Sequence, residues 1–153
     1  MLQQPIKVLW VGIGCKKGTS QELIADSIEF VLRQHQLNQS ALAGIATIDT
    51  KADEVGLVEL CQHLNLPLLT FPGDVLSSIC VPNSSQIVTT KLGTPSVAEA
   101  AALLAAKCQT LLVTKQIFKS NSELQGMVTI AIAQIENIRN QHSEKADILT
   151  PNS

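Results

Sequence analysis

The residues best suited to chemistry lie in a glycine-rich, doubly basic loop near the amino terminus. An apolar run, Ile6–Ile13, leads into Gly14-Cys-Lys-Lys-Gly18, and Thr19-Ser-Gln-Glu22 then reads as a capping box that opens a helix. Such a strand–loop–helix junction directs backbone N–H groups, a helix dipole and two lysines at one small volume. The loop therefore predicts an anion site, although the same glycines also suit a turn that only shapes the backbone.

Cys15 stands in this loop beside Lys16 and Lys17, where a thiolate is favoured. It has no obvious histidine partner in the sequence, so a nucleophilic role is a minor alternative. The other cysteines are Cys61 and Cys108, which fall in apolar helical patterns typical of a core, and Cys80. Neither the cysteines nor the three histidines have zinc-ligand spacing, and we expect reduced thiols in the cytoplasm.

A second group of polar residues follows the second predicted strand. Thr47 lies near the end of that strand, and Asp49, Lys51, Asp53 and Glu54 come just past it. Ligands of open α/β sheets bind at the carboxyl ends of the strands, so these residues are placed for function. The alternative is that Asp49 or Asp53 only caps the next helix while Lys51 faces solvent.

Two more candidates lie in the carboxyl-terminal half. Gly93-Thr-Pro-Ser96 precedes an alanine-rich helix, and Ser96 with Glu99 forms a second capping box. This helix entry also offers free N–H groups, which can face the first loop across the sheet. Lys115 ends a predicted strand and comes to the same edge as Lys51 if the strands run parallel.

The order of apolar patterns predicts an α/β fold in which strands alternate with helices. Small residues around Gly44 predict the close approach of a helix or a ligand. The segment 127–135 fits either a strand or a buried helix, and 86–92 either a strand or an extended connection. Strands are expected at 6–13, 41–48, 67–71 and 109–115, and helices at 19–35, 57–64, 72–79 and 97–107, with a polar loop at 117–126.

Composition fits one globular domain, expected at residues 1–136, and a polar, flexible tail at 137–153. Of the 153 residues, 45% are apolar and 16% charged, and there is no apolar run of 18 residues and no export signal. A formal charge of −2 and only four aromatic residues argue against nucleic acid as a partner. We therefore expect a cytoplasmic protein that binds neither nucleic acid nor membrane.

Three common motifs are excluded by spacing. Gly12-x-Gly14 lacks the third glycine of a dinucleotide-binding fingerprint, because Lys17 stands there. No Gly-Lys-Ser/Thr follows for a P-loop, and there is no G-x-S-x-G nucleophile elbow. A small nucleotide or phosphometabolite binder remains a hypothesis that rests on the glycine loop alone.

Three segments at matching spacing resemble the CobE/CbiG C-terminal domain family of cobalamin biosynthesis. The similarity runs over roughly residues 6–135, and the segments are 11–20, 46–57 and 93–103. The resemblance implies a three-layer α/β/α single domain with a mostly parallel or mixed sheet, acting on corrin-ring precursors. Two-domain CbiG proteins open the ring-A lactone of cobalt-precorrin-5A and release acetaldehyde.

The resemblance also implies roles for individual residues. If the domain hydrolyses a lactone, Glu54, in preference to Glu99, would activate water as a general base, while a lysine such as Lys51 or a loop N–H would stabilise the oxyanion. Lys16 and Lys17 stand where arginines are frequent. Substrate binding is expected at Gly12, Gly14, Cys15, Lys16, Lys17, Gly18, Thr19, Thr47, Gly93, Ser96 and Lys115, catalysis at Glu54, Lys51 and Glu99, with no metal and no cofactor.

The chain begins at the first strand, so it is similar to the stand-alone CobE type rather than to two-domain CbiG. We expect a protein that binds a cobalt-precorrin or precorrin and assists its processing. The alternative is a hydrolase that opens the lactone of cobalt-precorrin-5A. Other enzymes of cobalamin biosynthesis are possible partners, and a monomer or a homodimer is expected.

Overall fold

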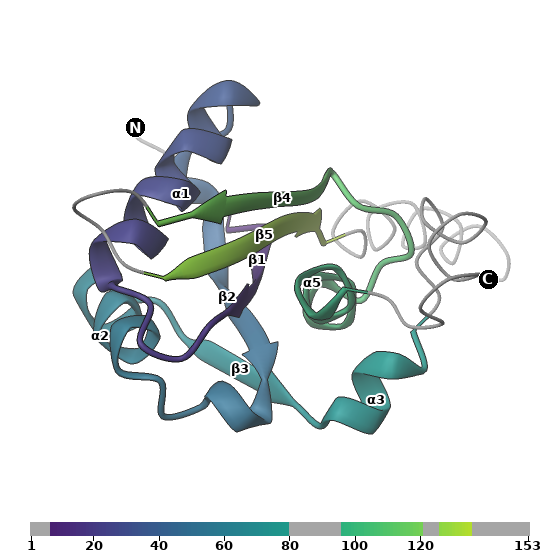
Figure 1. Cartoon of the computed structure of the whole chain (residues 1–153). Helices are drawn as coiled ribbons and strands as arrows, with labels where there is room; N and C mark the ends of the chain where they lie inside the picture. Colours follow the sequence, from purple (N-terminus) through teal and green to yellow (C-terminus); the bar gives the residue numbers. More distant parts are fainter. Residues whose placement is uncertain (1–6, 80–95, 121–125, 136–153) are drawn as a thin grey trace, which may run out of the picture.

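A computed structural model describes residues 7–79, 96–120 and 126–135, which form one five-stranded sheet with helices on both faces (Figure 1). The strands are β1 (Leu9–Cys15), β2 (Leu42–Ile48), β3 (Leu68–Phe71), β4 (Val113–Lys119) and β5 (Met127–Gln134). The helices are α1 (Gln21–Gln34), α2 (Val55–Leu64), α3 (Gly73–Ser77) and α5 (Val97–Ala106), with 3₁₀ turns η1 (Gln39–Ala41) and η2 (Asp49–Lys51).

The sheet is mixed, in the order β3-β2-β1-β5-β4. Strands β1, β2 and β3 run parallel, whereas β5 lies antiparallel between β1 and β4. The α/β class and the mixed sheet are confirmed, and the segment left open between strand and helix is strand β5. Because β1 is central, its carboxyl end lies in the middle of one edge of the fold, next to that of β2.

Alternation along β1 divides the core between the two faces of the sheet. Leu9, Val11 and Ile13 pack with α1 and α2, whereas Trp10 and Gly12 face α5. Figure 1 shows α1 and α2 on one side of the sheet and α5 on the other. The result is the three-layer arrangement expected from the resemblance, with β1 covered on both faces.

Helix α1 begins one residue later than the predicted capping box. Ser20 is the N-cap, and its hydroxyl accepts the N–H of Leu23 at 3.1 Å. The predicted cap, Thr19, is instead buried; its hydroxyl donates to the carbonyl of Lys16 at 2.6 Å and accepts the N–H of Met127 at 3.2 Å. Thr19 was the wrong prediction for the cap, because its hydroxyl is engaged by Lys16 within the loop and by Met127 of β5.

The alanine-rich helix α5 lies unusually close to the sheet. A Cβ placed on Gly12 would stand 1.9 Å from the carbonyl oxygen of Ala98. Gly44 has a different neighbour from the helix or ligand predicted for it: a Cβ there would stand 2.5 Å from the Trp10 indole ring. The absence of a side chain at Gly12 thus sets the distance between helix and sheet, and that at Gly44 makes room for Trp10.

The fourth strand begins later than predicted, at residue 113 rather than 109, and runs through part of the expected polar loop. Pairing with β5 decides its bounds, since tertiary pairing overrides local strand propensity. A register shift between Val113 and Gln116 places a bulge there. Strand β4 runs parallel to β1, as supposed, but Lys115 is near its start and not at its carboxyl end.

Several expectations fall outside the described residues and are not tested by the structure. They concern Gly93, Cys80, the segment 86–92 and the tail 137–153.

We predict that alanine at Gly12 destabilises the protein, whereas alanine at Gly14 leaves its stability nearly unchanged. Gly12→Ala should lower the free energy of unfolding by about 3 kcal/mol, because the new methyl group overlaps the α5 backbone. Gly14→Ala is the matched control: the nearest atom to its Cβ is 3.7 Å away, in Val97, so stability should change by less than about 0.5 kcal/mol. Urea denaturation of both variants measures the difference. Equal stabilities would contradict the close helix–sheet contact.

Candidate functional site

Four chemically capable residues meet at the carboxyl ends of β1 and β2. The Glu54 carboxylate accepts the backbone N–H of Gly18 at 2.8 Å through Oε2. The Lys51 ammonium lies 3.8 Å from the other oxygen, Oε1. The charges of Lys51 and Glu54 both influence the pKa of the Cys15 thiol. The side chains of Glu54 and Lys51 are only 10% and 21% exposed, so this is a partly desolvated cluster.

Glu54 joins two loops that are distant in the sequence. It occupies the N-cap position of α2, yet makes no side-chain capping bond because its carboxylate reaches Gly18 instead. Neither Asp49 nor Asp53, the predicted alternative caps, holds that position. The loops also pack directly: a Cβ on Gly56 would stand 2.5 Å from the carbonyl oxygen of Thr19. The geometry therefore depends on both loops together.

A hollow of about 620 Å³ lies between these loops. It holds two lysines and three carboxylates, together with the first residues of α1 and α2, whose N-termini carry partial positive charge. The hollow is thus mixed in charge. Its lining residues are Lys17, Gly18, Thr19, Ser20, Gln21, Thr50, Lys51, Asp53, Glu54, Val55, Gly56 and Glu59.

The environment of Cys15 differs from the one predicted. Burial raises the pKa of its thiol above the ordinary value; the Lys51 ammonium lowers this pKa and the Glu54 carboxylate raises it. The expectation of a thiolate was wrong, because desolvation outweighs the attraction of a cation. That cation is Lys51, whereas Lys16 and Lys17 are exposed.

Other predicted site residues have clear structural contacts. The Thr47 hydroxyl is fully buried and donates to the Ile13 carbonyl at 2.6 Å, which ties β2 to β1. The Lys16 N–H donates to the Met127 carbonyl at 3.0 Å and ties the loop to β5. Gly12 and Gly14 face α5. Substrate contact at these positions stays a prediction, whereas the structure shows that Thr47 joins two strands and Lys16 holds the loop to β5.

The Ser96, Glu99 and Lys115 group lies apart from the hollow. The Ser96 hydroxyl accepts the Glu99 N–H at 3.3 Å, which is half of the predicted capping box. The Glu99 carboxylate, 3% exposed, accepts the backbone N–H of Lys115 at 3.0 Å, at the β4 bulge. A Cβ placed on Gly14 would stand 3.7 Å from the Cβ of Val97, so α5 begins near the carboxyl end of β1 on the opposite face.

Lys115 and Lys51 do not share the predicted rim. Strand β4 is an outer strand, separated from β1 by β5, and the exposed Lys115 lies near its beginning. A strand predicted to end at residue 115 misplaced this lysine. The lining residues not predicted from the sequence are Ser20, Gln21, Thr50, Val55, Gly56 and Glu59. Glu59 follows Val55 by four positions on α2, and this helical spacing could have indicated it.

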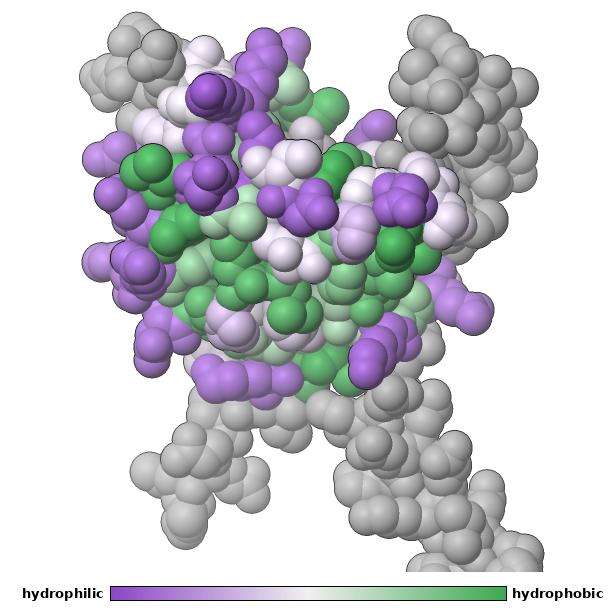
Figure 2. Space-filling view, turned by 90° about the horizontal axis from the view of Figure 1, so that it is seen from below, coloured by the Kyte–Doolittle hydropathy of each residue, from purple (hydrophilic) through white to green (hydrophobic). Residues whose placement is uncertain are grey.

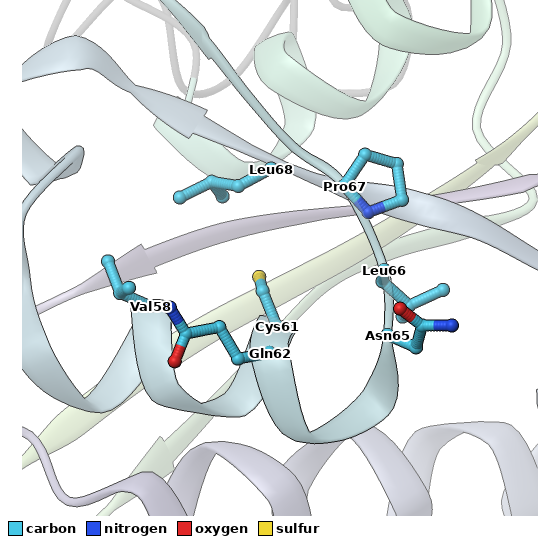
Figure 3. A pocket seen from close by; sticks show the side chains of 7 residues that line it. All are labelled: Val58, Cys61, Gln62, Asn65, Leu66, Pro67 and Leu68. Atoms are coloured by element: carbon cyan, nitrogen blue, oxygen red, sulfur yellow. The ribbon is translucent and has the colours of Figure 1, made fainter.

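A second hollow, of about 500 Å³, lies between α2 and β3 (Figure 3). Its lining holds no acidic or basic side chain, and burial raises the pKa of the Cys61 thiol to about 11. The Cys61 thiol is therefore protonated and unreactive at neutral pH. The lining residues are Val58, Cys61, Gln62, Asn65, Leu66, Pro67 and Leu68.

The part of the chain that the structure describes shows neither a cluster of metal ligands nor a membrane-spanning helix. Within residues 7–79, 96–120 and 126–135, no group of three or more histidine, cysteine or acidic side chains could hold a metal ion. None of the helices in these ranges is long and apolar enough to cross a bilayer.

Comparison with known proteins defines the class. The family model described as "Cobalamin synthesis G C-terminus" matches residues 9–133, which is most of the chain. The chain belongs to this CobE/CbiG C-terminal domain family of cobalamin biosynthesis. The resemblance drawn from its three sequence segments is thereby confirmed.

Particular relatives carry two different names. The chain is 34% identical over 129 residues to a cobalt-precorrin-5A hydrolase of Priestia megaterium, covering 84% of this chain and 33% of that protein. It is 27% identical over 116 residues to Protein CobE of Sinorhizobium sp, covering 74% and 75%. The chain thus spans about a third of the hydrolase and three quarters of CobE.

A solved structure agrees with the second relative. The crystal structure of CobE, "a protein from the cobalamin (vitamin B12) biosynthetic pathway", superposes with a TM-score of 0.64 at 32% identity, covering 87% of this chain and 94% of that one. This chain is therefore a cobalamin-biosynthesis protein of CobE/CbiG type.

The charges around Cys15 predict how its reactivity changes. Glu54→Gln removes the carboxylate that raises the Cys15 pKa, so the thiolate fraction and the rate of alkylation at pH 8 should increase. Lys51→Met removes the cation that lowers this pKa, so alkylation should slow. Mass spectrometry of iodoacetamide-treated protein gives the rate at Cys15, and Cys61, whose pKa is raised to about 11, should stay unmodified as long as the protein is folded. Shifts of the same sign in both variants would refute the electrostatic account.

Proposed function

We propose that this protein binds a corrin-ring precursor, a cobalt-precorrin or a precorrin, in the hollow between the two loops. In this role it is of the CobE type and assists the processing of the intermediate. The observation that carries the proposal is the partly desolvated cluster of Gly18, Lys51 and Glu54 inside that hollow. Family membership and the two curated relatives support the ligand class.

The chemistry of such a ligand fits the groups in the hollow. Precorrins carry many acetate and propionate carboxylates, which pair with ammonium groups and backbone N–H donors. A ligand carboxylate competes with Glu54 for the Gly18 N–H and for Lys51, while Lys17 is available on the same lining. The N-termini of α1 and α2 add about 0.3–1 kcal/mol for each exposed contact. The three lining carboxylates disfavour unspecific binding of polyanions.

The second candidate function is hydrolysis of the ring-A lactone of cobalt-precorrin-5A. The hydrolase of Priestia megaterium supports it, although the chain spans a third of that protein. In this mechanism the Glu54 carboxylate activates water, and Lys51 or the Gly18 N–H stabilises the oxyanion. Glu99 is a weaker candidate, because its carboxylate is buried against the β4 bulge.

The proposal includes the cellular compartment and the partner proteins. We infer that the protein works in the cytoplasm, consistent with Cys15 and Cys61, which form no disulfide. The enzymes that supply or consume the corrinoid are its proposed partners. A ligand handed between proteins needs a site that releases it, and competition by Glu54 for the same donors provides for release.

Binding is tested by titration with a panel of precorrins and cobalt-precorrins. A shift of the corrinoid absorbance that saturates at one ligand per chain is expected. Lys51→Met should weaken binding about tenfold, which corresponds to the ~1.4 kcal/mol of one charge-assisted contact. The matched control is Lys7→Met, an exposed lysine just before the amino end of β1 and remote from the hollow. Equal losses in both variants would refute the site, and a melting temperature raised by nucleotides but not by corrinoids would refute the ligand class.

Turnover is tested separately from binding. Incubation with cobalt-precorrin-5A should release acetaldehyde if the chain is a hydrolase, and Glu54→Gln should abolish release while the spectral shift persists. Glu59→Gln is the matched control, since it removes a carboxylate of the same lining that has no bond to Gly18. A spectral shift without acetaldehyde decides for the binding function alone. Undiminished release by Glu54→Gln excludes Glu54 as the base.

A further inference from the structure

The glycine loop closes in a tight turn whose form decides where the Gly18 N–H points. The Lys16 carbonyl accepts the backbone N–H of Thr19 at 3.1 Å, which defines a turn from Lys16 to Thr19. Gly18, the third residue of this turn, has a φ of +83°, whereas the φ of Lys17, the second, is not positive. This combination is that of a type II turn, in which the third residue is usually glycine.

The form of the turn amounts to a choice between two orientations of one peptide group. Type I and type II turns differ in the orientation of their central peptide group by roughly 150–170°. In the type II form the Gly18 N–H meets the Glu54 carboxylate at 2.8 Å, and the type I form would turn this N–H away from it. The N–H donor of the candidate site is therefore available only as long as the turn keeps its form.

The Thr19 side chain holds this turn from inside the protein. Its hydroxyl donates to the Lys16 carbonyl at 2.6 Å, so the last residue of the turn binds the first with both its backbone and its side chain. The same hydroxyl accepts the Met127 N–H at 3.2 Å, and the Lys16 N–H donates to the Met127 carbonyl at 3.0 Å. Both ends of the turn are thus bonded to the first residue of β5.

Backbone packs against Thr19 from two directions. A Cβ on Gly126, just before β5, would stand 2.4 Å from the Thr19 hydroxyl oxygen. The Thr19 carbonyl oxygen lies equally close to Gly56 of α2, the helix that has Glu54 at its N-cap. Thr19 itself is only 2% exposed. It therefore lies fixed between the strand that anchors the turn and the helix that presents the carboxylate.

The direction of this N–H matters because one broad face of the molecule offers few polar groups. Figure 2 views the molecule from the side on which β3 and α3 lie in Figure 1, and it shows hydrophobic residues gathered over the middle of that face. A polycarboxylate ligand needs cations and N–H donors, which hydrophobic side chains do not supply. The donors of the two loops, with Gly18 among them, therefore carry more of the recognition.

We propose that Thr19 is a positioning residue, whose buried hydroxyl keeps the turn in the type II form and the Gly18 N–H directed at the Glu54 carboxylate in the hollow. In this role Thr19 acts on a ligand through Gly18. That the directed N–H serves a corrinoid rests on the proposed function, whereas the control of its direction by Thr19 is independent of the ligand.

NMR of the ligand-free protein tests the positioning role through the Gly18 amide proton. Two pairs of proteins differ in little more than the hydroxyl: the unchanged protein with Thr19→Val, and Thr19→Ser with Thr19→Ala. In each pair, loss of the hydroxyl should shift the Gly18 amide resonance in the direction in which Glu54→Ala shifts it, because both changes remove the same bond. The second pair decides the matter if Thr19→Val does not fold.

Ser27→Ala is the matched control. It removes a hydroxyl that is also 2% exposed and that donates to the Leu23 carbonyl at 2.7 Å within α1. This variant should leave the Gly18 resonance in place whatever its effect on the melting temperature, which a purely structural role of Thr19 would change as well. A Gly18 resonance that stays in place without the Thr19 hydroxyl, or that shifts equally in Ser27→Ala, would overturn the proposal.

Titration with cobalt-precorrin-5A tests whether the directed N–H serves binding. Thr19→Ala should bind this corrinoid about tenfold more weakly than Thr19→Ser, the loss expected for one charge-assisted contact. Equal affinities of these two variants would overturn the role of Thr19 in binding. If the unchanged protein binds no corrinoid while the Gly18 resonance shifts as expected, the proposed function fails and the positioning role stands.

Discussion

The hydrogen bond from the Gly18 N–H to the Glu54 carboxylate is the contact on which the candidate site depends. It joins loops that are 36 residues apart in the sequence and belong to different β–α units. A bond from a backbone N–H to a carboxylate in a partly desolvated place contributes about 1.5–3 kcal/mol. The same carboxylate lies beside Lys51 and raises the pKa of Cys15, so one side chain sets both the shape and the electrostatics of the hollow.

The glycines of the first loop serve two separate purposes. Gly12 lies where α5 approaches the sheet so closely that no side chain fits. Gly18 has a φ of +83°, a left-handed conformation that favours glycine, and this conformation accompanies the N–H that Glu54 accepts. A glycine-rich motif therefore need not be a single binding device. Here its start packs the fold and its end forms the site.

Features that depend on the local order of residues were predicted most accurately from the sequence. Lys51 and Glu54 come just past one strand, so a parallel sheet brings them to the first loop. Thr19 and Ser20 are equally good caps, and only the contact with Met127 decides between them. The partial burial of Cys15 and the bulge at Lys115 depend on β5, which runs antiparallel between β1 and β4 and pairs with both. These features could not be predicted, because they arise from contacts distant in sequence.

The mixed charge of the hollow bears on how a polycarboxylate ligand would act there. A ligand carboxylate that takes the Gly18 N–H and Lys51 replaces the bonds of Glu54 with bonds of the same kind, so that single exchange contributes no more than about 1.4 kcal/mol. Affinity then has to come from several contacts at once, which favours a ligand with many carboxylates over one with a single anionic group. The exchange also frees the Glu54 carboxylate next to the bound ligand. Binding and the release of a potential base are in this way the same event, which is why a site of this construction suits both a carrier and a hydrolase.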